Sequence, residues 1–530
     1  MKHALPGFSG VVMTLAALCA SPAFAATEPV AGDAISASPA TPIAVAIRSS
    51  VSGKLKDFYR PRGYWPLWAQ DGAIGEEADR LIDLIETADT EGLNPSDYDP
   101  KVLRKLIEKA REEPTPANIA KAELRLSRAF ASYVSDTRGP PGVKMVYLDQ
   151  ELVPEPPSQI AVLRAAGVAP SFLRYMTEMG WASPVYAKLR DALVAYQADW
   201  GGLPSVHIAA GPTLRSGSKG DRVRLMRMRL GLAPGDRFDK EAAARLRAFQ
   251  TMHGMKADGI AGKGTIAALN RTPAHYERLI RLNLERARVI PSPRRRHILV
   301  DAAAARLWLY EDGEAKDTMR VVVGQPTQPT PMLAGMMRYV VVNPYWNVPP
   351  DLVQRRIAPR VLKGEASLSG LRYEALSDWT HDAHVLNQSE IDWQSVAAGG
   401  QTLRLRQLPG GNNAMGRVKF MFPNDLGIYL HDTPDKALFK EDDRRFSSGC
   451  VRVEDAGRLA EWLFRKPLEP KTGDPEEQIY LPEPVPVYIT YLTASPTDKG
   501  IAFREDAYGR DGDEEARLAG HPVAKKRPVG

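Results

Sequence analysis

The chain has 530 residues, of which 44% are hydrophobic and 25% are charged, and its formal net charge is +6. This length predicts roughly three or four domains, and the hydrophobic fraction excludes an intrinsically disordered chain. The small positive charge suits an anionic envelope polymer or a membrane surface.

The N-terminus carries an export signal. Met1-Lys2-His3 precedes an apolar stretch, and Ala23-Phe24-Ala25 is a typical cleavage pattern, so residues 1–25 are predicted to be a signal peptide. Cys19 would be removed with the signal peptide. The alternative is a lipoprotein anchor on Cys19, but the preceding Leu18 is not the small residue that such processing favours. No later apolar run approaches the ~18 residues that span a bilayer. We expect a soluble periplasmic protein, a location that argues against nucleic acid as partner.

The first half of the mature chain is predicted to be helical. Residues 26–44 are rich in Ala, Pro, Ser and Thr and are predicted to be a disordered leader. Residues 45–205 show helical periodicity broken by proline-containing turns, which indicates a helical domain without evident chemistry. Residues 272–292 are predicted to form a return helix and a linker.

Residues 206–271 form a separate small unit of short helices joined by glycine turns. It contains Phe249-Gln250, Gly254, Asp258-Gly259, Gly262 and Thr265 in that order. This string is similar to the three-helix peptidoglycan-binding domain of cell-wall enzymes. The resemblance implies recognition of glycan or stem peptide, although the same residues would build turns in any case.

Within residues 293–495 the hydrophobic period changes to two, which predicts a β-rich domain with a hairpin at the turn Glu311-Asp312-Gly313. A polar insertion spans about 364–405. Its pair His381-x-x-His384 has a spacing that can bind zinc, but no further histidine or cysteine lies nearby, so no metal and no cofactor are predicted. Residues 496–530 are predicted to be an extension with a basic tail, disordered from about Asp511.

The β-rich domain carries the candidate chemistry at His431 and in the run from Ser447 to Arg452. Cys450 would be the lone cysteine of the mature chain; a thiolate is a nucleophile, and an imidazole can take its proton. The alternative is a buried structural cysteine. We expect Cys450 near the N-terminus of a following helix, whose dipole would lower the pKa of the thiol. The backbone N–H groups of Gly449 and Cys450 are candidates for an oxyanion hole, and the carbonyl of Asp432 is a candidate to orient His431.

This run resembles the catalytic signature of the L,D-transpeptidases of the YkuD type: a histidine, a gap of under twenty residues, then Ser/Thr-His-Gly-Cys. Ser448 stands where many members have a second histidine. The order of the segments is similar to that of the large branch of the family, which implies an α+β multidomain protein: a helical scaffold, a peptidoglycan-binding unit and a catalytic domain with a capping insertion.

The resemblance also implies an activity in cell-wall organisation and cell shape. Cys450 would be the nucleophile and His431 the general base and acid, forming 3-3 crosslinks between peptidoglycan stem peptides through a thioester with release of D-alanine. Trp346, Tyr429, Ser448 and Arg452 are candidate substrate-binding residues. The alternatives are an L,D-carboxypeptidase, a ligase that joins a protein lysine to the wall, and a non-catalytic wall-binding protein.

Overall fold

Three helices in the N-terminal half begin at a Ser-Pro or Thr-Pro pair. Thr41, Thr115 and Ser183 each accept a hydrogen bond from a backbone N–H of the first turn, and each is followed by proline. Proline suits this position because the first N–H groups of a helix have no partner within it. Local sequence therefore sets where these helices start.

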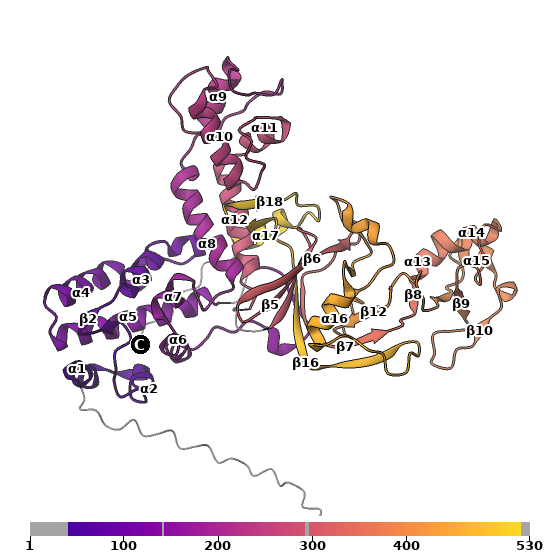
Figure 1. Ribbon diagram of the computed structural model, residues 1–530, viewed down its shortest axis with the longest axis horizontal. Coiled ribbons are helices and arrows are strands. Elements are labelled where there is room, and N and C mark those ends of the chain that lie inside the picture. The colour runs from indigo at the N-terminus through magenta and orange to yellow at the C-terminus, as the bar shows by residue number, and fades with distance from the viewer. Residues whose placement is uncertain (1–40, 140–141, 292–295, 521–530) are drawn as a thin grey trace, which may run out of the picture.

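The computed structural model describes residues 41–139, 142–291 and 296–520. The predicted signal peptide, most of the predicted leader and the basic tail lie outside the described residues. The leader was predicted to reach residue 44, but helix α1 already begins at Pro42. Figure 1 shows a helical body at one end, a projecting arm, a central sheet and a small lobe at the other end. Among the described residues no helix is both long and apolar enough to cross a membrane.

The helical body packs around α5. Its elements are α1 (Pro42–Ser50), α2 (Lys56–Tyr59), β1 (Ala69–Gln70), β2 (Ala73–Ile74), α3 (Glu77–Glu86), α4 (Pro100–Glu112), α5 (Pro116–Thr137), α6 (Gln159–Gly167), α7 (Phe172–Thr177) and α8 (Pro184–Tyr196). Glu123 of α5 is fully buried and accepts hydrogen bonds from the Tyr59 hydroxyl at 2.7 Å and the Trp68 N–H at 2.9 Å. These bonds offset the cost of burying a carboxyl group.

The arm carries the small glycine-rich unit at its tip (Figure 1). It consists of α9 (Asp221–Arg229), α10 (Lys240–Met252) and α11 (Lys263–Leu269), and α12 (Pro273–Ala287) leads back to the body. Gln250 explains the Phe-Gln and Asp-Gly pattern: its side chain donates to Asp258 Oδ1 at 3.0 Å and accepts from the Gly259 N–H at 2.8 Å. The pattern residues thus hold the turn between α10 and α11.

The central sheet is continuous around a closed path. Its strands are β3 (Val146–Tyr147), β4 (His297–Asp301), β5 (Arg306–Glu311), β6 (Glu314–Gly324), β7 (Leu333–Val342), β12 (Val418–Met421), β13 (Leu430–His431), β14 (Arg445–Ser447), β15 (Val451–Val453) and β16 (Glu477–Thr490). The order is β12-β13-β15-β6-β5-β4-β16-β7-β3, and β12 also pairs with β7. This last pairing closes eight strands into a barrel, which removes exposed strand edges. β3 belongs to the segment predicted to be purely helical.

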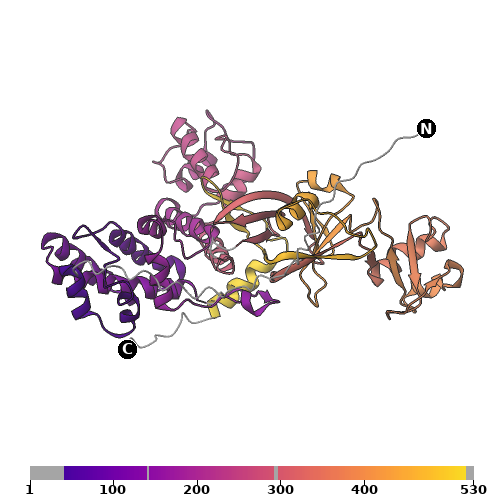
Figure 2. The ribbon, with the colours of Figure 1, turned by 60° about the horizontal axis from the view of Figure 1, so that its bottom comes forward.

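The insertion folds as a lobe of its own, set apart from the rest in both views (Figure 2). It contains β8 (Trp346–Val348), α13 (Pro350–Leu352), α14 (Ala358–Leu362), β9 (Tyr373–Leu376), β10 (Val385–Leu386), α15 (Trp393–Ala398) and β11 (Arg404–Gln407). Its sheet has the order β10-β9-β11-β8 and covers a separate hydrophobic core. The lobe therefore begins before residue 364, because β8 supplies one edge of its sheet.

The C-terminal segment is ordered as far as the structure describes it, to residue 520, which corrects the prediction of disorder from Asp511 for residues 511–520. It forms β17 (Ala494–Pro496), β18 (Ile501–Phe503) and α17 (Arg510–Gly520). The preceding helix in the chain is α16 (Ala456–Phe464), which lies before β16. Fully buried Arg286 of α12 pairs with Asp511 Oδ1 and with Glu514 Oε2, each at 2.7 Å. The charged composition suggested solvent exposure, but two carboxylates of this segment pair with Arg286 inside the protein.

Replacing Arg286 with methionine should lower the free energy of unfolding by about 3 kcal/mol, because it leaves two carboxylates facing each other without their cation. Denaturant unfolding followed by circular dichroism measures the loss. Arg174→Met is the control: the Arg174–Glu178 pair lies on the surface, where solvent screens the charges, and its loss should change stability far less. Equal losses in the two variants would contradict the prediction.

The α+β multidomain organisation predicted from the sequence is confirmed, with a helical body, a small unit of three short helices and a β-rich domain.

Candidate functional site

His431 and Cys450 come together because β13 and β15 pair in parallel. Leu430 lies opposite Val451 and His431 opposite Arg452, which puts Cys450, one residue before β15, beside Tyr429. The antiparallel pairing of β12 places Lys419 opposite His431. Directly opposite residues of neighbouring strands point to the same face of a sheet. His431 therefore stands between two cationic side chains, those of Lys419 and Arg452.

The thiol of Cys450 is largely enclosed. It donates a hydrogen bond to the Gly427 carbonyl at 3.3 Å. Burial raises the pKa of Cys450, and hydrogen bonds from the backbone and hydroxyl of Tyr429 oppose that rise, as do the charges of Arg452 and Lys419. The free protein therefore holds a neutral thiol, next to groups that would stabilise its thiolate.

The expected helix N-terminus is not at Cys450. Strand β15 follows the cysteine directly, and α16 begins only at Ala456, capped by the side chain of Asp455. The prediction failed because a short strand intervenes between Cys450 and the helix. Neighbouring cations and Tyr429 take the place of the helix dipole as the groups that favour the thiolate.

His431 is 2% exposed, and its Nδ1 lies 2.5 Å from the carbonyl oxygen of Asp432. A carbonyl only accepts, so Nδ1 carries the proton and the lone pair lies on Nε2. The expectation that Asp432 orients the ring agrees with this contact. Burial, with the charge of Arg452 as the next cause, lowers the pKa of His431 to about 3. The imidazole is therefore neutral and able to accept a proton.

The turn that carries Cys450 is held by Ser447. Its hydroxyl donates to the Cys450 carbonyl at 2.5 Å and accepts from the Gly449 N–H at 3.2 Å. Gly449 has φ +113°, a region that side chains disfavour. The Gly449 amide is thus engaged, whereas the Cys450 N–H makes no hydrogen bond within the described part of the chain. Ser447 was not singled out in the sequence, although its place three residues before the cysteine suits such a turn.

The remaining predicted substrate-binding residues lie in three different environments. Ser448 is exposed on the turn. Arg452 is largely enclosed, its Nε is buried without a hydrogen bond among the described residues, and burial lowers its pKa. Trp346 is half-buried in the lobe, where its ring contacts that of Tyr373 with centroids 6.3 Å apart. The structure thus brings Tyr429 and Arg452 to the site, whereas Trp346 packs within the lobe.

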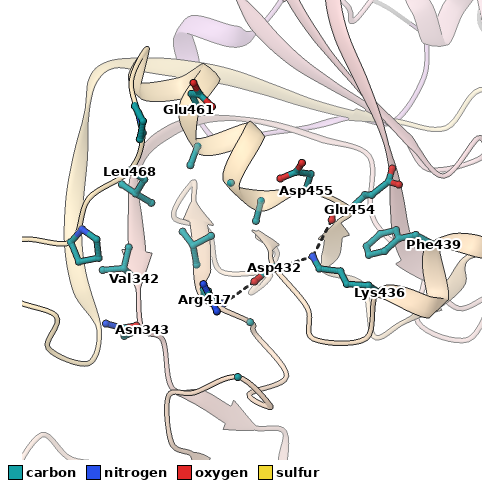
Figure 3. A pocket seen from close by; sticks show the side chains of 18 of the residues that line it. Val342, Asn343, Arg417, Asp432, Lys436, Phe439, Glu454, Asp455, Glu461 and Leu468 are labelled. Atoms are coloured by element: carbon teal, nitrogen blue, oxygen red, sulfur yellow. Dashed lines mark hydrogen bonds and ion pairs between the residues drawn. The ribbon is translucent and has the colours of Figure 1, made fainter.

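A cavity of about 1110 Å³ adjoins these strands at the ends of β13 and β15, beside α16. Figure 3 shows Asp432 at its wall, where the carboxylate accepts from Lys436 Nζ at 2.7 Å and from the Arg417 N–H at 2.9 Å. Asp432 therefore holds His431 through its backbone and is itself held through its side chain. Neither His431 nor Cys450 lines this cavity.

The described residues contain no group of three or more His, Cys, Asp or Glu side chains placed to hold a metal ion. His381 lies 3.6 Å from Asp382, and both side chains are fully exposed. The chemistry available at the site is nucleophilic, with a thiol, an imidazole and a backbone amide.

Three family comparisons cover most of the described chain. Residues 295–488 match the L,D-transpeptidase catalytic domain of the YkuD type, residues 53–193 the family described as "Scaffold domain", and residues 224–269 that described as "Putative peptidoglycan binding domain". A protein of Haemophilus influenzae named "Putative L,D-transpeptidase" is 32% identical over 237 residues, which are 43% of this chain and 47% of that protein. The resemblance found in the sequence is confirmed. The match spans about half of the relative's length.

Two solved structures are also similar. An L,D-transpeptidase of Xylanimonas cellulosilytica is 16% identical, with 53% of this chain and 98% of that chain covered and a TM-score of 0.16. A mutant of the Enterococcus faecium L,D-transpeptidase is 15% identical, with 38% and 51% covered and a TM-score of 0.16. At such scores neither adds to the family assignment.

Acid should destabilise the protein through His431. A histidine in an unfolded chain titrates near ~6.5, whereas burial lowers the pKa of His431 to about 3. The unfolded chain binds the extra proton between these values, so stability falls as pH drops through that window. From pH 7 to pH 5 the His431 contribution should be about 2 kcal/mol. His431→Asn should lose correspondingly less than the wild type in denaturant unfolding, and His207→Asn, at an exposed position, controls for the substitution. Identical losses in all three proteins would contradict this expectation.

Removing the Tyr429 hydroxyl should slow reaction of Cys450 with iodoacetamide. The hydroxyl hydrogen bond favours the thiolate, so Tyr429→Phe raises the pKa of the thiol and should lower the alkylation rate at pH 8 about threefold to tenfold. Tyr480→Phe, which alters an exposed tyrosine, should react like the wild type. An unchanged rate in Tyr429→Phe would mean that its hydroxyl does not influence the sulfur.

Proposed function

We propose that this chain, whose residues 295–488 match the L,D-transpeptidase catalytic domain, uses Cys450 as nucleophile to form 3-3 crosslinks between peptidoglycan stem peptides. The observation that carries the proposal is the adjacency of a thiol and a neutral imidazole whose proton sits on Nδ1. Export to the periplasm through a signal peptide in residues 1–25 completes the proposal, since the polymer lies outside the cytoplasm.

The first step is deprotonation of Cys450. In the free protein the thiol donates to the Gly427 carbonyl, and the described residues provide no hydrogen bond between the sulfur and the His431 ring. The Cys450 side chain therefore turns toward Nε2 of His431 on substrate binding. The proton passes to Nε2, and Lys419 and Arg452 stabilise the thiolate as it forms.

The thiolate then attacks the carbonyl carbon of the third residue in a donor stem tetrapeptide. A C–S bond forms, and the negative charge moves to the carbonyl oxygen, where the free Cys450 N–H can donate to it. Gly449, predicted to share this role, would first have to leave the Ser447 hydroxyl. The peptide C–N bond breaks, His431 protonates the departing amine of D-alanine, and a thioester remains on Cys450.

The second half repeats these events with an acceptor. The side-chain amine at the third residue of a neighbouring stem attacks the thioester while His431 takes its proton, and collapse of the intermediate returns the thiol and releases the crosslinked peptide. Arg452 suits the carboxylate of a stem peptide, because its guanidinium is largely enclosed and its Nε has no partner among the described residues. Such a charge is costly to bury unless an anion joins it.

The small unit formed by α9–α11 is proposed to bind the glycan or stem peptide. Its match to a peptidoglycan-binding family supports this role. Because the unit sits at the tip of the arm (Figure 1), it would engage the polymer at a point away from Cys450 and keep the strand near the site. Binding at two points raises the effective concentration of substrate.

Mass spectrometry of products tests the proposal. The mature protein, incubated with disaccharide tetrapeptide, should yield a crosslinked dimer that has lost one D-alanine. Cys450→Ala should reduce product at least about 10⁴-fold, because it removes the nucleophile. His431→Gln should leave the fold intact and reduce turnover by a comparable factor.

Each contrary result points to a different function. Trimmed tripeptide without dimer would indicate a carboxypeptidase, because water then replaces the amine. No change in the peptide, with the protein still retained on purified peptidoglycan, would indicate a wall-binding protein. Product formation by Cys450→Ala would remove the cysteine from the mechanism.

A further inference from the structure

The loop between β6 and β7 meets the catalytic turn through one buried hydroxyl. Thr330 is fully buried, and its Oγ1 lies 2.8 Å from the carbonyl oxygen of Gly449. Thr330 Oγ1 also accepts a hydrogen bond from the Gly324 N–H at 2.9 Å. Since that N–H can only donate, the hydroxyl proton is directed to Gly449. Thr330 therefore holds the backbone at the residue before the nucleophile.

Holding the Gly449 carbonyl determines the direction of the Cys450 N–H. The two groups belong to one peptide unit, which is planar and trans, so the N–H points opposite to the carbonyl. A rotation of this unit would move both groups together. Gly449 itself, at φ +113°, offers little resistance to such a rotation because it has no side chain.

Thr330 is in turn fixed from the C-terminal segment. Arg510 Nη2 donates to the Thr330 carbonyl at 2.8 Å, and the Tyr508 hydroxyl donates to the Gly324 carbonyl at 2.6 Å. Arg510 opens α17, the helix that the buried Arg286 pairs anchor. The loop is packed tightly against the end of β6, because a Cβ at Gly324 would lie 2.2 Å from the Gln328 carbonyl oxygen.

We propose that Thr330, held by Arg510, is a positioning residue that aims the Cys450 N–H at the oxyanion of the tetrahedral intermediate. This inference rests on the proposed cysteine mechanism and deepens it. The hydroxyl touches no substrate; it keeps one peptide unit in the orientation that transition-state stabilisation needs, before the reaction starts.

The proposal separates two reactions of the same sulfur. Acylation by p-nitrophenyl acetate passes through an oxyanion and needs the aimed N–H, whereas alkylation by iodoacetamide displaces iodide directly and forms no oxyanion. Thr330→Val keeps the shape and removes the hydroxyl. It should slow acylation about tenfold, seen in the burst of nitrophenolate, and leave the alkylation rate within about twofold. On the tetrapeptide it should lower kcat with KM nearly unchanged.

Three further variants complete the experiment. Thr330→Ser should restore acylation, because it returns the hydroxyl. Arg510→Gln leaves Thr330 in place and should slow acylation in the same direction, so the proposal stays testable if Thr330→Val fails to fold. Arg504→Gln is the matched control: Arg504 bonds Ser495 Oγ within the C-terminal segment and should behave as the wild type.

Wild-type acylation in both folded Thr330→Val and Arg510→Gln overturns the proposal. A parallel fall in acylation and alkylation also overturns it, since that result means a general collapse of the turn. A wild type that is acylated by the ester but inert toward tetrapeptide contradicts the proposed substrate and leaves the Thr330 comparison valid. A wild type whose thiol alkylates but accepts no acyl group from either compound overturns both proposals.

Discussion

The parallel pairing of β13 with β15 is the constraint on which the site depends. It brings together two residues nineteen positions apart in the chain, His431 and Cys450, through a register that two short strands define. A slip of one residue would turn His431 to the opposite face of the sheet. The neighbours β12 and β6 prevent this slip, because both are antiparallel to the pair and belong to the closed barrel.

Burial and positive charge act against each other at this site. Burial favours the neutral forms of both Cys450 and His431, and Lys419 and Arg452 favour the thiolate while opposing a protonated imidazole. The resting pair is therefore uncharged, which is the cheaper state in a dry environment.

Buried polar contacts stabilise the scaffold internally and join the C-terminal segment to the helix that returns from the arm, in addition to apolar packing. Glu123 binds the aromatic segment before β1 within the scaffold, and Arg286 binds α17 to the helix that returns from the arm. Where α10 ends, a Cβ at Gly254 would lie 2.7 Å from the Ala502 Cα, so the small unit rests directly on the C-terminal hairpin. The C-terminal segment thus contacts both the arm and the loop between β6 and β7 that carries Thr330.

Much of this protein could be predicted from the sequence, because the informative signals are local. Thr-Pro and Ser-Pro pairs start helices, Gln250 and Asp258 build a turn, and alternation marks the strands of the barrel. His431, Cys450 and the Asp432 carbonyl were singled out because their chemistry is recognisable in residue type and order. Disorder from Asp511 was wrong, because composition shows charge but not the partner that neutralises it.

The sequence by itself determined the order of the segments, the class of fold and the choice of His431 and Cys450 as the candidate reactive pair. Only the tertiary structure decided the closure of the barrel by β12 and β7, the strand in place of a helix after Cys450, and the contacts of Ser447 and Thr330 with the catalytic turn. The physical reason is that periodicity and capping act over a few residues. Register and buried hydrogen bonds join residues up to hundreds of positions apart, and no local pattern encodes which of them will meet.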